Sequence, residues 1–196
     1  LKTLKELNTR FKLEDSEKLD CGEKILDYCK KLKEYLKGYD PKTNLIIGID
    51  SLFDLNFPSQ KFKTDKEKNE YIAQEIKRWA KTEIKAPIFG TIHLRKIDKR
   101  RADISDVKES GRYIYDASVV FLLHNDVSRN GQNASIYYTQ PNCDEFLPII
   151  ELQWAKNKKS SFKGITYYHL ISNYSKVIEC TEEEMKRFNN LRFSSK

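Results

Sequence analysis

The sequence lacks any long hydrophobic run and contains only one methionine in 196 residues. Its longest apolar stretches, 44–50 and 118–123, have the length of strands, far short of the roughly 20 residues that a membrane-spanning helix needs. The first residues also lack the pattern of a secretory signal peptide. We therefore expect a soluble, cytoplasmic protein. The chain begins with Leu1 and its single methionine is Met185, which favours a fragment of a longer protein.

Cysteines are few and scattered. The four of them, Cys21, Cys29, Cys143 and Cys180, show no CxxC spacing. This distribution favours neither a zinc site nor a disulfide framework and fits a reducing compartment.

A phosphate-binding loop of the form GxxxxGK[ST] is also missing. The nearest imitation, GYDPKT at 38–43, lacks the second glycine. It also follows a predicted helix and precedes a strand, whereas a true loop of this kind follows a strand and precedes a helix. We therefore reject this segment as a nucleotide cradle.

What is present is enough apolar sequence for one substantial core. Hydrophobic residues make up 39% of the chain and charged residues 33%. The 36 lysines and arginines exceed the 29 acidic residues by seven. This surplus favours a polyanionic partner such as nucleic acid, but it also fits an ordinary lysine-rich solvated surface.

Helices and buried strands alternate in the first half of the chain. Apolar residues recur at helical spacing over 22–38 and over about 65–82, whereas 44–50 and 87–94 are continuous apolar runs. This alternation predicts a parallel sheet with crossover helices, whose ligand edge lies at the carboxyl ends of the strands. A further short strand is predicted at 10–13.

The second half is richer in strands. Charged residues without apolar period predict an exposed loop at 95–105, followed by a helical turn near 106–110. Thr181 and Glu184 match a capping box that opens a last helix. No domain boundary is evident, so we expect a single domain over 1–196. The strands predicted in this half are 119–124, 135–138, 148–155 and 165–171.

Two predicted strand ends carry residues suited to nucleotide chemistry. Asp50 follows a hydrophobic strand, as carboxylates beside hydrated Mg²⁺ often do, although a strand that simply ends on a polar residue fits equally well. His93 ends the next strand, where an imidazole could sense a phosphate or a water, while a structural histidine is the commoner case. His124 and His169 receive no role, because no other residue near them has metal-ligand spacing.

Basic residues are concentrated in two segments. Five of the seven residues at 95–101 are basic, a density that suits contact with a nucleic-acid backbone, and the alternative is a solvated loop. Gly111 would let a backbone approach a phosphate closely. Lys156 and Lys158 end another strand, where cations could reach the triphosphate of a neighbouring subunit, and the alternative is an ordinary basic turn.

Taken in order, four segments resemble the C-terminal motor domain of DnaB-type replicative helicases, which are hexameric RecA-like ATPases. LIIGIDSL at 45–52 is similar to the Walker B strand of that family, and PIFGTIHLRK at 87–96 to its phosphate-sensing strand. The most specific likeness is ISDVKESG at 104–111 with DASVVF at 116–121, which the family writes as SDLRESG and DADVV. AKNK at 155–158, with Gly164, resembles its AKQRNGPTG. The resemblance spans about 11–171 and leaves 172–196 as a tail with a helix.

The resemblance implies a fold, a function and a set of site residues. The fold would be α/β, a RecA-like P-loop NTPase core with a mostly parallel sheet flanked by helices and added antiparallel strands toward the C-terminus. Asp50 would hold Mg²⁺ through water, His93 would occupy the sensor position in place of glutamine, and Lys156 and Lys158 would act in trans on ATP, with lysine in place of the arginine finger. The DNA-gripping residues would be Arg100, Arg101, Lys108, Glu109 and Gly111.

These implications give one leading function and its alternatives. We expect part of an ATP-dependent DNA helicase of bacterial, phage or mobile-element origin, a homohexamer that moves on single-stranded DNA and meets a loader or primase. The family's Walker A loop and catalytic glutamate would lie upstream, so this chain alone would be inactive. The alternative is a non-catalytic RecA-like module that binds single-stranded DNA or assembles with a helicase. A relative of the RecA recombinase or circadian-clock ATPases is a third, weaker possibility.

Overall fold

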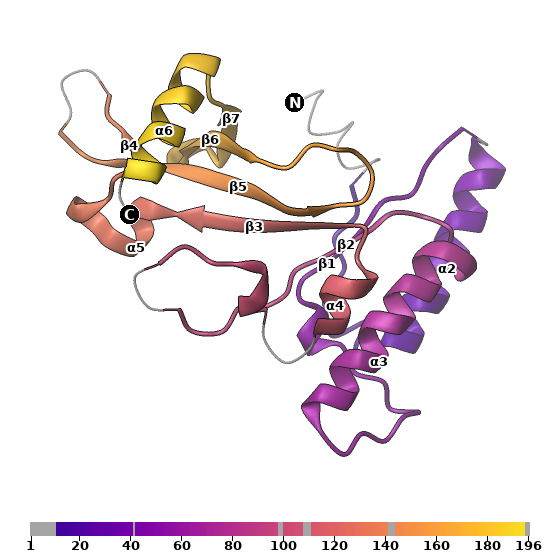
Figure 1. Ribbon diagram of the computed structural model, residues 1–196. Helices are drawn as coiled ribbons and strands as arrows, with labels where there is room; N and C mark the ends of the chain where they lie inside the picture. Colours follow the sequence, from indigo (N-terminus) through magenta and orange to yellow (C-terminus); the bar gives the residue numbers. More distant parts are fainter. Residues whose placement is uncertain (1–10, 41, 98–99, 108–110, 141–143, 195–196) are drawn as a thin grey trace. The chain divides into compact units, whose positions relative to one another are not determined.

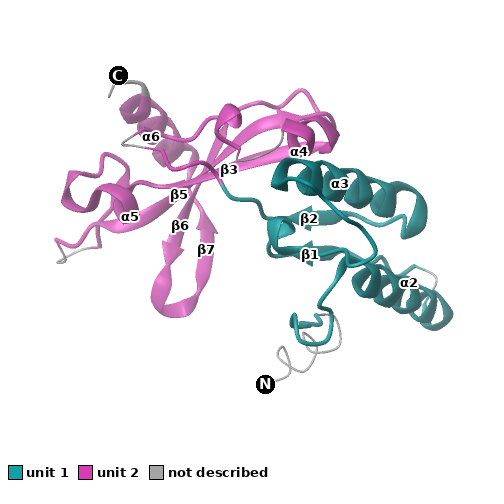
Figure 2. Cartoon of the chain, turned by 90° about the horizontal axis from the view of Figure 1, so that it is seen from below, with its two compact units in different colours: residues 1–93 teal, residues 94–196 magenta. Residues whose placement is uncertain are grey.

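The computed structural model describes residues 11–40, 42–97, 100–107, 111–140 and 144–194, and Figure 1 traces their helices and strands. The chain divides into two compact units, 1–93 and 94–196, coloured separately in Figure 2. The single domain expected over the whole length stays a prediction. No helix in the described part of the chain is long and apolar enough to cross a membrane.

The first unit is built on a parallel pair of strands, β1 (Ile47–Ile49) and β2 (Ile88–Gly90). Both predicted strands are therefore present but shorter than expected. The helices α2 (Gly22–Tyr39) and α3 (Asp65–Arg78) agree with the predicted ones, and one π-helical turn (Trp79–Glu83) continues α3. The strand predicted at 10–13 is wrong, since 11–13 form no strand and residue 10 lies outside the described part.

The core of the first unit lies around the ring of Phe57. Phe57, Ile72, Trp79 and Ile84 are each at most 3% exposed. The start of α2 approaches this ring so closely that a Cβ on Gly22 would lie 2.3 Å from it. A glycine is therefore required at the point where α2 begins.

The second unit is an antiparallel sheet in the order β3-β5-β6-β7, with β4 paired to β5. The core packs α6 against this sheet through Ile149, Tyr167 and Phe188, all fully buried. The predicted antiparallel strands toward the C-terminus are thus confirmed. The elements of this unit are α4 (Gly111–Asp116), β3 (Val119–Asn125), α5 (Asp126–Asn130), β4 (Tyr137–Tyr138), β5 (Leu147–Asn157), β6 (Ile165–Ile171), β7 (Lys176–Glu179) and α6 (Glu182–Ser194).

Two details of this unit differ from the sequence prediction. β7 was not expected, because all four of its residues are exposed and the strand therefore has no apolar period to reveal it. The helical turn predicted at 106–110 begins earlier, as a 3-10 turn (Ile104–Asp106), and 108–110 lie outside the described residues. The capping box of α6 is confirmed, since Thr181 Oγ1 accepts from the Glu184 amide and Glu184 Oε2 accepts from the Thr181 amide.

Candidate functional site

Asp50 lies at the carboxyl end of β1, beside the carboxyl end of β2. The Thr91 amide donates to the Ile49 carbonyl at 3.0 Å, and this bond places the Thr91 side chain next to Asp50. The Thr91 hydroxyl then donates to Asp50 Oδ1. Both side chains are exposed. The result is an accessible pair of oxygen-bearing side chains at the edge of a parallel sheet, where α/β proteins bind ligands.

His93 lies two residues beyond Thr91 and is held by an aromatic contact. Its ring stacks on Phe53 with the ring centroids 5.6 Å apart and the planes 11° from parallel. The Phe53 carbonyl in turn accepts from Lys68 of α3 at 3.3 Å. The 3-10 turn after β1 therefore supports the imidazole near the same sheet edge as Asp50.

Gly90 lets this turn pack over the end of β2. A Cβ at Gly90 would lie 2.5 to 2.7 Å from three side-chain carbons of Leu52, which is 7% exposed. The Leu52 amide also donates to the Thr91 carbonyl at 2.9 Å. The close approach of Leu52 to a glycine thus fixes the segment that links Asp50 to Phe53.

The basic segment at 95–101 is a loop, as predicted, but it is less exposed than predicted. Arg100 makes two bonds to the Asp106 carboxylate, at 2.5 and 2.7 Å. The pKa of Asp106 falls to about 2, chiefly through this bond to Arg100 and also through the amide of Asp103, with burial opposing. Arg95 and Lys96 are exposed.

Arg101 corrects the expectation of an exposed loop, because its side chain points into the second unit. It is 22% exposed and contacts both carboxylate oxygens of Glu151 at 2.7 to 3.0 Å. Arg192 of α6 binds the same carboxylate at 3.2 Å, and Glu151 is only 1% exposed. A guanidinium that charges a buried carboxylate's pocket stabilises the fold. Contact with DNA through Arg101 stays a prediction.

Three residues expected in the nucleic-acid loop, Lys99, Lys108 and Glu109, lie outside the described part of the chain. Gly111 begins α4, and a Cβ there would meet no other atom within 4 Å. The fold itself therefore does not require a glycine at position 111, and any requirement for one must come from a ligand.

Lys156 and Lys158 come together at the carboxyl end of α4. Lys156 Nζ donates to the carbonyls of Ile114 and Tyr115, the latter at 3.1 Å, and Lys158 Nζ donates to the Tyr115 carbonyl at 3.2 Å. Cations are favourable at this end of a helix, where carbonyls lack intrahelical partners. The two ammonium groups predicted to act in trans thus share one anchoring point.

The residues at the sheet edge fit Mg²⁺ only as an outer shell. A carboxylate and a hydroxyl are oxygen donors, which Mg²⁺ prefers, and Mg²⁺ usually keeps several of its waters. Asp50 and Thr91 are exposed and could bind those waters. The sequence holds no loop that would surround a triphosphate. Nucleotide phosphates would therefore need donors from outside these residues.

The sequence matches no protein-family profile and none of the curated proteins. Among solved structures it is similar to the ATPase domain of a DnaB-like helicase, with a TM-score of 0.65 at 20% sequence identity. The match covers 80% of this chain and 51% of that one, so the chain spans about half the length of the structure it resembles. The fold is RecA-like.

The RecA-like fold confirms the predicted architecture, but several residues of its edge escaped the sequence interpretation. Thr91 and Phe53 carry no motif of their own. Thr91 lies two residues before His93, and Phe53 three after Asp50, so their proximity to strand ends was the available signal. Glu151 was missed because it alternates with apolar residues in β5 like any residue on the outer face of a strand.

Proposed function

We propose that this chain is part of an ATP-dependent DNA helicase motor that couples ATP hydrolysis at subunit interfaces to movement along single-stranded DNA. The observation that supports this most is the meeting of Asp50 and His93 at one edge of the β1–β2 pair, within a RecA-like fold. The DnaB-like sequence motifs place an acid and a phosphate sensor at these two positions.

In this proposal, Asp50 binds water of a hydrated Mg²⁺, and Thr91 fixes the orientation of the Asp50 carboxylate by donating to Oδ1. His93, stacked on Phe53, senses whether a phosphate occupies the edge. ATP and Mg²⁺ supply the hydrolysis that drives the motor. The phosphate cradle comes from a part of the protein that this sequence does not contain.

Lys156 and Lys158 act on ATP bound by the adjacent subunit of a homohexamer. Their charge compensates the triphosphate without the bidentate fork that an arginine would offer. Their anchoring on the carbonyls of Ile114 and Tyr115 supports this role, because it restrains two flexible side chains near one point. Neighbouring subunits, and a helicase loader or a primase, are the protein partners of this proposal.

The DNA partner is a single strand held by its phosphates. Arg100, Arg101, Lys108, Glu109 and Gly111 are the proposed contact residues. The pairing of Arg100 with Asp106 leaves that guanidinium 57% exposed, so one face of it can still reach a phosphate. Replacing Arg100 and Lys108 by alanine should weaken binding to single-stranded DNA and reduce the salt slope by about 0.7 per lost phosphate contact.

The decisive experiment replaces Asp50 in the full-length protein that contains this chain. Asp50→Asn should lower DNA-stimulated ATP hydrolysis and unwinding of a forked duplex by about 100-fold. Asp54→Asn is the matched control, because Asp54 lies four residues further on and bonds to Ser51, a bond that asparagine can keep. Equal activity of the two variants would contradict the proposed role of Asp50.

The alternative is a non-catalytic RecA-like module that binds single-stranded DNA or assembles with a helicase. The missing phosphate loop favours it. In that case the full-length protein would bind single-stranded DNA with unchanged affinity in the presence of ATP, and Asp50→Asn would alter neither DNA binding nor any nucleotide hydrolysis.

A further inference from the structure

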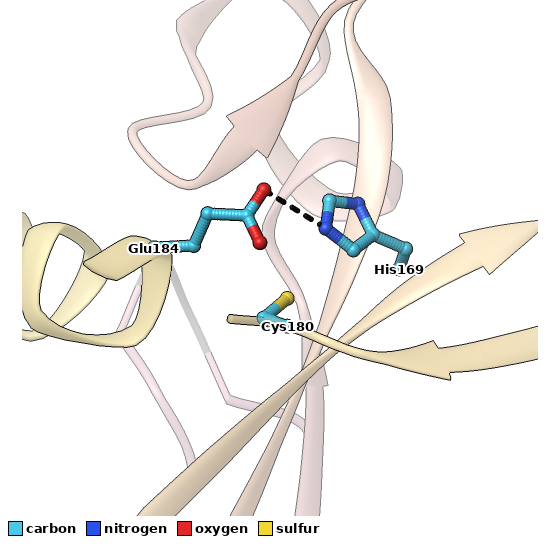
Figure 3. Close-up of side chains that lie close together, drawn as sticks. All are labelled: His169, Cys180 and Glu184. Carbon is cyan, nitrogen blue, oxygen red and sulfur yellow. Dashed lines mark hydrogen bonds and ion pairs between the residues drawn. The ribbon is translucent and has the colours of Figure 1, made fainter. Parts of the chain in front are cut away.

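Three potential metal ligands converge in the second unit, far along the chain from the sheet edge described above. His169 lies in β6, Cys180 directly follows β7, and Glu184 lies in the first turn of α6. Their ligand atoms all lie within 4.8 Å of one another (Figure 3). The sequence spacing did not reveal this cluster, since 10 residues separate His169 from Cys180, and only strand pairing brings them together.

The cluster is held in place by the surrounding fold. Cys180 is 3% exposed and belongs to the core with Tyr167 and Phe188, and its amide donates to the Tyr167 carbonyl at 2.9 Å. The Tyr138 ring meets the His169 ring edge to face, with the centroids 4.5 Å apart. The fold therefore fixes the thiol and the imidazole before any ion arrives, which reduces the entropic cost of binding one.

The carboxylate of Glu184 is oriented in the same way. Its Oε2 accepts from both the amide and the hydroxyl of Thr181, at 2.8 and 3.0 Å. This leaves Oε1 turned toward His169 Nε2, 3.0 Å away (Figure 3). The capping box thus serves a second purpose, because it aims one oxygen of Glu184 at the space between the imidazole and the thiol.

We propose that His169, Cys180 and Glu184 bind a zinc ion that fastens α6 to β6 and β7. Nitrogen, sulfur and oxygen ligands together suit Zn²⁺, whereas Mg²⁺ and Ca²⁺ require oxygen alone. Ligand atoms around tetrahedral zinc lie roughly 3.3 to 3.8 Å apart, given bonds of about 2.0 to 2.3 Å. The three side chains need only close in slightly from their present separation to reach this geometry.

Binding changes the contacts of the cluster in a defined way. The zinc ion replaces the hydrogen bond between His169 and Glu184, and the Cys180 thiol loses its proton to solvent as the zinc–sulfur bond forms. Water fills the fourth position. Glu184 is 31% exposed and His169 17%, so the ion enters past these two side chains while the thiol stays buried.

The test uses Co²⁺ and Zn²⁺ as probes on the full chain after treatment with a chelator. Co²⁺ should bind in a one-to-one ratio and produce a thiolate-to-cobalt absorption band, which Zn²⁺ then abolishes by displacing Co²⁺, while Mg²⁺ has no effect. Cys180→Ala should abolish the band. Glu184→Gln, which can preserve the capping box, should weaken Zn²⁺ binding by more than the roughly 10-fold typical of a lost supporting contact.

Matched controls separate this site from adventitious binding. Cys29→Ala removes another buried cysteine, and Glu183→Gln removes the neighbouring acid of the same helix turn. Both should bind Co²⁺ like the unaltered chain. The proposal is overturned if no thiolate band forms in the unaltered chain, or if Glu184→Gln binds Zn²⁺ as tightly as Glu183→Gln does. Because Glu184→Gln keeps the cap, a loss of folding cannot account for its result.

Discussion

Arg101 binds the carboxylate of Glu151, a residue 50 positions further along the chain, through three bonds of 2.7 to 3.0 Å. Its neighbour Arg100 binds Asp106 instead and stays 57% exposed. Two adjacent arginines of one basic segment therefore have different functions. Arg101 neutralises a carboxylate that is 1% exposed, whereas the Arg100 pair is largely solvated.

This difference predicts unequal losses of stability. Arg101→Gln should lower the free energy of unfolding by about 3 kcal/mol, because it removes one partner of a buried ion pair and leaves Arg192 alone to compensate Glu151. Arg100→Gln should cost about 1 kcal/mol or less, as exposed pairs do. Urea unfolding of both variants measures the difference. Similar losses for the two would show that Glu151 does not depend on Arg101.

The sequence predicted what depends on apolar period and on strand ends. The helices 22–39 and 65–78 follow their apolar faces, and Asp50 and His93 were found because each ends a buried run. Contacts between distant segments carry no such local signal. The burial of Arg101 against Glu151 depends on a loop folding back onto β5, and a basic loop that folds inward has the same sequence pattern as one that is solvated.

Acid should destabilise the second unit through Asp106. The bond from Arg100 and the amide of Asp103 lower the pKa of this carboxyl from 3.8 to about 2, against burial. Because the folded state holds the proton less tightly, the stabilisation is complete above about pH 4 and is lost as the pH falls toward about 2. Urea midpoints measured across this range should fall less steeply for Asp106→Asn than for the unaltered chain.

The control for this acid dependence is Asp144→Asn, which removes an exposed carboxylate from the same unit. Its midpoints should follow those of the unaltered chain. If Asp106→Asn were as sensitive to acid as the Asp144 variant, other carboxylates would have to account for the loss.

Gly90 and Gly48 should respond differently to alanine although they lie in adjacent strands. Gly90→Ala places a Cβ 2.5 Å from Leu52, so the turn that carries Phe53 must shift, at about 1 to 3 kcal/mol of unfolding free energy. A Cβ at Gly48 meets nothing within 4 Å. Thermal unfolding of the two variants provides the comparison, and a loss at Gly48 equal to that at Gly90 would contradict the proposed packing.

The proposed action of Lys158 on a neighbouring subunit predicts complementation between two inactive variants. Asp50→Asn disables the site that a subunit carries, and Lys158→Ala disables what it gives to its neighbour. Each homogeneous full-length variant should lose about 100-fold in ATP hydrolysis. Random mixing at equal amounts creates interfaces with an intact Asp50 on one side and an intact Lys158 on the other, roughly a quarter of the total in a head-to-tail ring.

Mixed rings should therefore regain about a quarter of the normal rate per interface if interfaces act independently. Lys159→Ala is the matched control for Lys158→Ala, because it removes the next lysine of the same turn and should leave hydrolysis unchanged on its own. Mixtures that stay as inactive as their components would place Lys158 and Asp50 in the same subunit's site. Full activity of Lys158→Ala alone would leave its bond to the Tyr115 carbonyl as its role.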